Sequence, residues 1–253
     1  MDFTDTGSQE GRVRVYNFPM LTEMELTGRA TTHVVQRDDL GAALEHETLQ
    51  AFLAMREAAA LEGIEIRIVS GYRDFAAQQR IWDEKYLGER PLYDAQGNTR
   101  EHGALDPDQL IDAIVCWSAV PGGSRHHWGT ELDVIDSAAL PDGYRVRLMP
   151  DEAHPGGVFD RLHRWLNANM GVFGFYRPYR TFRGGVNPEP WHLSYAPVAA
   201  HALDTLTLVA FQNAVRTSSI LGKDRVLARS SEIYQRYIAN VDMPDSAGNG
   251  MLA

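Results

Sequence analysis

The stretch SRHHWGTELDVID, residues 124–136, sets two histidines and a glycine ahead of a run in which acidic and apolar residues alternate. This period of two predicts a strand over TELDVID. Because successive side chains of a strand point to opposite faces, one face would carry Glu131, Asp133 and Ile135. The other face would carry Thr130, Leu132 and Val134. A carboxylate in a buried strand needs a partner, because an unpaired buried charge is costly. A metal shared with a loop histidine would supply that partner. Two surface histidines beside an exposed edge strand are the other explanation of this stretch.

The composition narrows the classes of function that the chain can have. Its 253 residues carry 24 basic and 34 acidic side chains, a net charge of −10, which argues against nucleic acid or an anionic membrane surface as the main partner. No apolar run approaches the roughly 20 residues of a transmembrane helix, so we expect no membrane insertion. Cys116 is the only cysteine, which excludes a thiolate-rich zinc site, and we expect it in the core. Any metal here must be held by histidines and carboxylates.

The first residues lack the basic and apolar regions of a signal peptide. The sequence therefore predicts a cytoplasmic protein, with the periplasm or cell wall as the alternative if the chain has been trimmed. We expect one domain over 1–253, with an irregular N-terminal arm at 1–30.

Helical spacing, caps and stop signals predict helices over 44–62, 74–86, 106–117 and 159–170, and two terminal helices within 198–240. Strands are predicted at 30–36, 64–70, 130–136 and 191–196. Because there is no regular alternation of strand and helix with a glycine-rich loop, the fold class is α+β. We expect a small, mostly antiparallel sheet flanked by helices, with a C-terminal helical extension.

Two further stretches hold polar groups that are suited to catalysis. In NPEPWHLSY, which ends at Tyr195, Glu189 precedes His192 by three residues and is restricted to extended conformations by Pro190. This pair fits a general base beside a metal ligand, or simply a turn glutamate and a packed histidine. In SGYRDFAAQ, residues 70–78, Arg73 stands where a strand passes into a helix. It either points into a cleft, where a guanidinium stabilises oxyanions, or lies on the surface.

Taken together and in order, the patterns SGYR…Q, SxHxxGxxxD and ExWHxxY are far more specific than each alone. They resemble those of the zinc-dependent D-alanyl-D-alanine carboxypeptidase family, the VanY-like peptidases, which are related to D-Ala-D-Ala dipeptidases and phage peptidoglycan endolysins. The resemblance covers about residues 64–196.

The resemblance implies one catalytic Zn²⁺ per chain, held by His126, Asp133 and His192 in a cleft. It also implies that Glu189 is the general base and that Arg73 stabilises the oxyanion. We expect the substrate-binding residues to be Ser124, Gln78, Tyr195, Trp191 and Glu131. When the motif is aligned in this way, His127 is not a ligand, and Asp136 is an ordinary acidic residue at the end of the strand.

Glu131 departs from the family pattern, which commonly has a small residue at this position. It could support a ligand histidine, narrow the pocket, or meet a positive group on the substrate.

The implied reaction is hydrolysis of the C-terminal D-Ala from a peptidoglycan-type peptide, so the expected partner is a stem peptide or its precursor. D-Ala-D-Ala dipeptidase, L,D-carboxypeptidase and endolysin-type endopeptidase share this metal chemistry, and we expect loops 88–105 and 140–157 and the stretch 172–188 to decide between them. A non-catalytic zinc-containing binding domain is the alternative from another class. The terminal helices either support a homodimer or pack onto the domain of a monomer.

Overall fold

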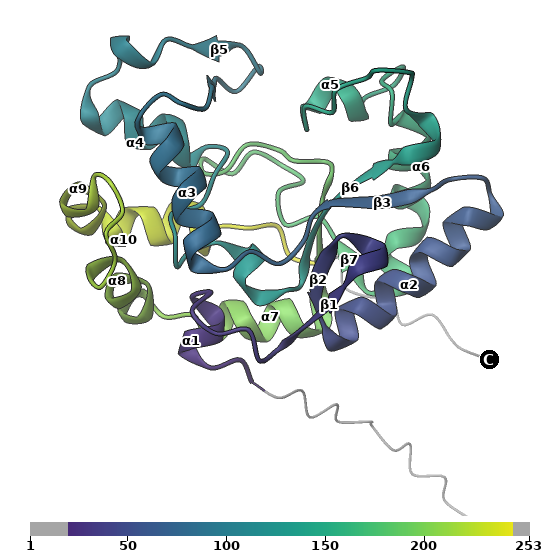
Figure 1. Ribbon diagram of the computed structural model, residues 1–253, viewed down its shortest axis with the longest axis horizontal. Coiled ribbons are helices and arrows are strands. Elements are labelled where there is room, and N and C mark those ends of the chain that lie inside the picture. Colours follow the sequence, from purple (N-terminus) through teal and green to yellow (C-terminus); the bar gives the residue numbers. More distant parts are fainter. Residues whose placement is uncertain (1–19, 245–253) are drawn as a thin grey trace, which may run out of the picture.

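The computed structural model describes residues 20–244 and has an α+β architecture (Figure 1). Its main sheet has four strands in the order β3-β6-β8-β7, and every neighbouring pair is antiparallel. These strands are β3 Ile66–Ser70, β6 Glu131–Asp136, β8 His192–Tyr195 and β7 Phe175–Tyr176. Two small hairpins complete the strands: β1 Val34–Arg37 with β2 Ala42–Glu45, and β4 Leu92–Tyr93 with β5 Thr99–Arg100. The predicted fold class and antiparallel sheet are confirmed.

Two of the helices, α3 Phe75–Tyr86 and α4 Pro107–Val115, begin where the sequence places capping residues. Asp74 accepts a hydrogen bond from the backbone of Ala77, and Asp106 forms a capping box with Gln109. The α-helices are α1 Glu23–Leu26, α2 His46–Leu61, α3 Phe75–Tyr86, α4 Pro107–Val115, α5 Pro150–Ala153, α6 Asp160–Asn169, α7 Ala196–Thr205, α8 Leu208–Arg216, α9 Lys223–Ala228 and α10 Ser230–Ile233. Short 3₁₀ turns cover Asp38–Leu40, His102–Ala104, Arg125–Trp128, Ser137–Ala139 and Met170–Phe173, and a π turn covers Tyr234–Ile238.

Strand β6 is central in the sheet and its residues are all buried. Leu132 and Val134 pack with Phe52 of α2 and Leu162 of α6 in one apolar cluster. Because successive side chains of a strand alternate, this packing turns Glu131 and Asp133 to the opposite face. The alternative of an exposed edge strand is therefore wrong.

A second apolar cluster joins α3 and α4 to the C-terminal helices, and Figure 1 shows these helices on the side of the sheet away from α2 and α6. Phe211, Val215 and Ile238 share this cluster with Trp82 and Ile114. The C-terminal segment therefore packs onto its own chain, one of the two outcomes expected from the sequence.

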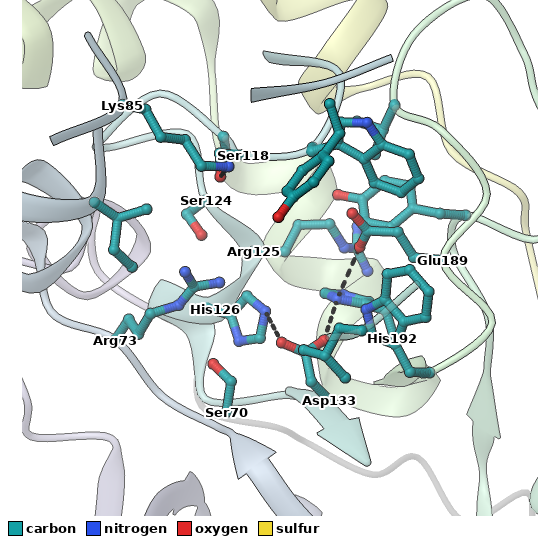
Figure 2. Close-up of a pocket in the computed structure, with 18 of the residues that line it drawn as sticks. Ser70, Arg73, Lys85, Ser118, Ser124, Arg125, His126, Asp133, Glu189 and His192 are labelled. Atoms are coloured by element: carbon teal, nitrogen blue, oxygen red, sulfur yellow. Dashed lines mark hydrogen bonds and ion pairs between the residues drawn. The ribbon is translucent and has the colours of Figure 1, made fainter. Parts of the chain in front are cut away.

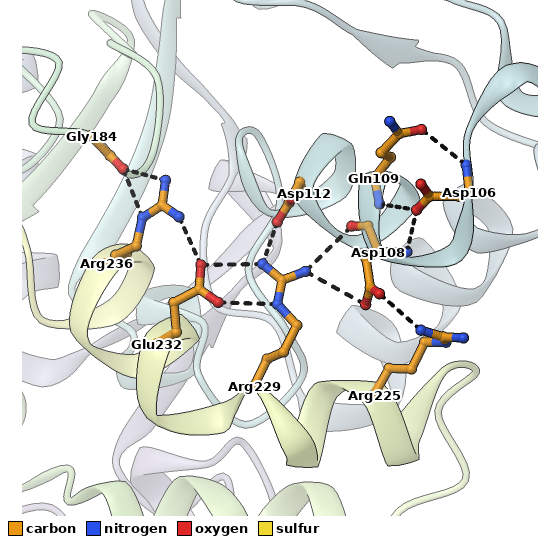
Figure 3. A network of polar contacts seen from close by, with 9 residues as sticks. All are labelled: Asp106, Asp108, Gln109, Asp112, Gly184, Arg225, Arg229, Glu232 and Arg236. Atoms are coloured by element: carbon orange, nitrogen blue, oxygen red, sulfur yellow. Dashed lines mark hydrogen bonds and ion pairs between the residues drawn. The ribbon is translucent and has the colours of Figure 1, made fainter.

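The prediction of two terminal helices was wrong in detail. The segment contains four α-helices and a π turn, because Thr207 caps a new helix and the chain bends at Arg229. Figure 3 shows that Arg229 also ties this segment to α4, where it contacts Asp112 at 2.5 Å. Arg229 also pairs with Glu232 at 3.1 Å, within the C-terminal segment itself.

The segment 88–105, expected to be a loop, contains the short strands β4 and β5, and the stretch 172–188 contains β7. Of the expected N-terminal arm, residues 1–19 lie outside the described part of the chain, and α1 follows them. Within residues 20–244, no helix has the length and apolar character needed to cross a membrane.

Candidate metal centre and catalytic pocket

The pairing of β6 with β8 brings the predicted metal ligands together. Asp133 stands directly opposite His192, and Glu131 stands opposite Ser194. Cross-strand partners share one face of a sheet, so all four side chains project to the same side. His126 joins them from the 3₁₀ turn before β6. Nitrogen and oxygen atoms of His126, Asp133 and His192 all lie within 4.8 Å of one another, and the three side chains are buried.

Hydrogen bonds hold each histidine so that one ring nitrogen faces this cluster. The Nδ1–H of His126 donates to the carbonyl of Gly71 at 2.8 Å, which leaves Nε2 facing Asp133 at 3.4 Å. The Nε2–H of His192 donates to Glu131 at 2.7 Å, which leaves Nδ1 facing Asp133 at 3.0 Å. Such outer hydrogen bonds fix the ring orientation and raise the basicity of a ligand histidine.

Glu131 lies beneath the cluster, inside a buried ion pair. Its carboxylate accepts a hydrogen bond from Arg125 at 3.1 Å, from Ser194 at 2.7 Å and from Thr130 at 3.0 Å, in addition to the bond from His192. The Arg125 guanidinium also stacks over Trp128, 4.6 Å from the ring centre. Of the roles that the sequence left open for Glu131, the structure favours support of a ligand histidine.

The electrostatics of the cluster follow from burial and from these pairs. Burial lowers the pKa of His126 to about 3, and the charge of Arg73 adds to this effect. Burial opposes a charge on Asp133, but His126 and His192 hold its pKa at about 2. Burial likewise opposes a charge on His192, yet its hydrogen bonds to Asp133 and Glu131 raise the pKa to about 10. A neutral His126 and an ionised Asp133 are the forms in which these groups bind metals.

Glu189 lies at the edge of the cluster, with Oε2 3.5 Å from Nδ1 of His192. Its backbone is held by a hydrogen bond to the carbonyl of Tyr179 at 2.9 Å. Arg177 donates to the carbonyl of Pro190 at 2.6 Å and so holds the same turn. Burial raises the pKa of Glu189 to about 7, close to the value that suits a general base at neutral pH.

Arg73 follows β3 and lines the same pocket. Its backbone N–H donates to the carbonyl of His126 at 3.1 Å, and its own carbonyl accepts from Nδ1 of His127 at 2.7 Å. The ring of His127 is buried, and its Nε2 accepts from the backbone of Gly122 at 3.0 Å. His127 therefore positions Arg73 and lies outside the metal cluster, consistent with the sequence prediction.

The glycine of SxHxxG is required by close packing. Gly129 has a φ of 70°, and a Cβ added to it would lie 2.6 Å from a methyl group of Val34 and 2.8 Å from the backbone nitrogen of Glu45. Any side chain would push the 3₁₀ turn that carries His126 away from the β1–β2 hairpin.

These groups line one pocket of about 320 Å³, and Figure 2 shows the ligands, Arg73 and Glu189 facing its interior. Ser124 and Trp191 belong to its wall, and Trp191 stacks with Trp117 at a centroid distance of 6.3 Å. All three segments expected to shape the cleft also contribute. Their residues in the wall are Arg90, Tyr93, Arg147, Leu148, Met149, Tyr179 and Val186.

Three of the residues predicted to contact the substrate, Gln78, Tyr195 and Glu131, are not among the residues that line this pocket. Gln78 is buried and donates to the carbonyl of Ala119 at 2.8 Å. The ring of Tyr195 packs against Phe175 at a centroid distance of 5.4 Å. Glu131 is engaged by Arg125 and His192, as described above.

The structure adds wall residues that the sequence did not indicate: Lys85, Trp117, Ser118 and Arg125. For Arg125 a signal was present, since a glutamate predicted in a buried strand calls for a nearby cation. Cys116 is not part of the pocket wall and lies half-buried at the end of α4. Burial raises the pKa of its thiol, which disfavours the nucleophilic thiolate.

Two histidine nitrogens and one carboxylate oxygen form a donor set that suits Zn²⁺, and three protein ligands are typical of catalytic zinc sites. The residues present therefore fit this metal: the donor atoms converge, and hydrogen bonds already orient both histidines.

Known proteins resemble this chain across the site. The family model described as VanY: D-alanyl-D-alanine carboxypeptidase matches residues 41–198. An uncharacterised protein of Haemophilus influenzae is 36% identical over 127 residues, which cover 49% of this chain and 95% of that protein. A D-alanyl-D-alanine carboxypeptidase of Enterococcus faecalis is 32% identical over 147 residues, covering 57% of this chain and 45% of that enzyme.

Among solved structures, the vancomycin resistance D,D-pentapeptidase VanY in complex with Zn(II) is 24% identical, with a TM-score of 0.48. The match covers 73% of this chain and 90% of that one. VanYB in complex with D-alanine-D-alanine is 25% identical, with a TM-score of 0.47, and the match covers 76% of this chain and 92% of that one.

Proposed function

The chain belongs to the VanY family of D-alanyl-D-alanine carboxypeptidases, and from this premise we propose that it is a zinc peptidase that releases the C-terminal D-Ala from peptidoglycan-type peptides. The observation that carries the proposal is the convergence of the buried triad His126, Asp133 and His192 with Glu189 in one pocket. A general base beside three metal ligands is the arrangement that metal-assisted hydrolysis requires.

When bound by the triad, zinc would act as a Lewis acid that polarises the scissile carbonyl and makes the attacking water more acidic. Glu189 accepts the proton of this water and then delivers it to the leaving amine. Arg73 donates hydrogen bonds to the carbonyl oxygen as negative charge develops there. Trp191 lines the same pocket, and burial raises the pKa of Glu189 to about 7, which suits a group that both accepts and returns the proton.

The D,D-carboxypeptidase reaction leads the alternatives because the matching family model carries this description. D-Ala-D-Ala dipeptidase, L,D-carboxypeptidase and endopeptidase activity require the same catalytic groups. The masses of the products separate them, since a carboxypeptidase releases one residue, a dipeptidase releases two, and an endopeptidase cleaves between stems.

The proposal is tested by Glu189→Gln, which removes the base while preserving the shape of the side chain. We expect this variant to bind zinc as the wild type does and to lose activity by about 10²–10⁴-fold, the usual contribution of a general base. Glu57→Gln, which changes an exposed carboxylate on α2, is the matched control. Near-normal turnover by Glu189→Gln would remove Glu189 as the base.

A further inference from the structure

The pocket wall carries more positive charge than the proposed chemistry uses. Five cationic side chains line it, whereas Asp133 and Glu189 are its only acids. The cations are Arg73, Lys85, Arg90, Arg125 and Arg147. This excess stands out in a chain with a net charge of −10.

Three of these cations are already neutralised by carboxylates within the described chain. Arg125 pairs with Glu131 at 3.1 Å, Arg90 with Glu84, and Arg147 with Asp151. Within residues 20–244, neither of the other two cations has a carboxylate within ion-pair distance. They are Arg73, which the proposed mechanism uses at the scissile carbonyl, and Lys85, which it does not use.

Lys85 lies in the last turn of α3, and its Nζ donates to the hydroxyl of Ser118 at 2.7 Å. Burial lowers the pKa of this ammonium to about 8; Glu189 raises it, and Arg73 and Arg90 lower it. Lys85 is partly buried, and a cation with reduced access to water and no carboxylate partner within residues 20–244 is poorly compensated. An anionic ligand would supply the missing charge.

Figure 2 shows where such a ligand would lie. Lys85 and Ser118 lie side by side, and Ser124 lies between Lys85 and His126. Lys85 therefore lies apart from the metal ligands but lines the same pocket. A substrate bound at the catalytic groups would still have room to place another polar group beside it.

We propose that Lys85 and Ser118 form an anion subsite that binds a carboxylate of the peptide substrate and thereby selects anionic peptides. This inference rests on the proposed function. Two groups of a peptide have the required chemistry: the free C-terminal carboxylate, and a carboxylate side chain on the residue before the scissile bond. In both cases the ammonium and the hydroxyl donate hydrogen bonds to one carboxylate, a charge-assisted contact.

The experiment measures kcat/KM of the zinc-loaded enzyme on two matched pairs of peptides whose last residue is D-Ala. One pair compares a free C-terminal acid with its amide, and the other compares glutamate with glutamine before the scissile bond. Wild type, Lys85→Met and Lys85→Arg are measured, with Lys85→Gln alongside in case the apolar variant does not fold. If Lys85 had a purely structural role, its substitution would lower kcat/KM for all four peptides together. The test is therefore the ratio of kcat/KM within each pair, the acid over the amide and glutamate over glutamine.

We expect Lys85→Met to lower one of the two wild-type ratios by about tenfold or more, the usual effect of losing a hydrogen bond to a charged group, and Lys85→Arg to retain most of it. The affected pair identifies which carboxylate is bound. If the variants cleave the peptides with both ratios unchanged, the subsite is refuted and the proposed function stands. If wild-type enzyme cleaves none of the peptides, both are refuted.

Discussion

The buried pair of Arg125 and Glu131 offers the sharpest test of how the metal cluster is held. Glu131→Ala removes a carboxylate that accepts hydrogen bonds from Arg125, Thr130, His192 and Ser194. It leaves the guanidinium of Arg125 inside the protein, where its Nε and Nη1 already have no hydrogen-bond partner within the described chain. Breaking a buried pair in this way costs about 3–5 kcal/mol.

The measurement is urea unfolding of the metal-free protein, so that altered metal affinity does not enter the free energy. In a chain of this size, 3–5 kcal/mol corresponds to a fall in Tm of about 6–20 °C. The double variant Arg125→Met/Glu131→Ala removes both charges and fills part of the space with an apolar side chain. We expect it to recover most of the lost stability, because no unpaired charge remains.

The same substitution tests support of the metal ligand. Without Glu131, the Nε2–H of His192 loses its acceptor, and we expect zinc to bind about 10–100-fold more weakly. Glu131→Gln keeps an acceptor oxygen and is expected to retain more of the affinity. The reasoning fails if Glu131→Ala costs less than about 1 kcal/mol, or if the double variant is as unstable as the single variants combined.

Two other substitutions test the ligand set and the packing of the C-terminal helices. His126→Ala leaves two metal ligands, so we expect the purified protein to lose zinc; unchanged zinc content by elemental analysis would refute the ligand assignment. Arg229→Ala is expected to cost about 1 kcal/mol because its partners are partly exposed, whereas Phe211→Ala should cost about 3–5 kcal/mol in the apolar cluster beside it. Equal losses in urea unfolding would contradict the expectation that apolar packing contributes more than the ion network at this interface.

Local signals predicted the main helices and the sheet well. Helical spacing of apolar residues predicted α2, α3, α4 and α6, with capping residues at the start of α3 and α4, and the alternation in β6 separated its apolar face from its acids. The short strands β4, β5 and β7 were missed because two residues carry no detectable period. Their pairing depends on tertiary contacts that a single segment does not reveal.

Part of the candidate site could also be predicted from the sequence, and part of it could not. The converging side chains were predictable because the three motifs together resemble one family. The partners that tune them were not, because they come from elsewhere in the chain: Gly71 is 55 residues from His126, and Tyr176 is 51 residues from Arg125. Gln78 shows that a motif match does not reveal the local contacts of a side chain, since its amide donates to the carbonyl of Ala119, a residue of the pocket wall, while Gln78 itself is not part of that wall.

The most direct test of the central claim is mass spectrometry of the products formed from tri-, tetra- and pentapeptide stems with D- or L-terminal residues, with zinc and with a chelator. The account predicts release of a single C-terminal D-Ala, abolished by the chelator and restored when zinc is added back. No cleavage of any stem in the presence of zinc, or cleavage that continues undiminished in the chelator, would contradict it.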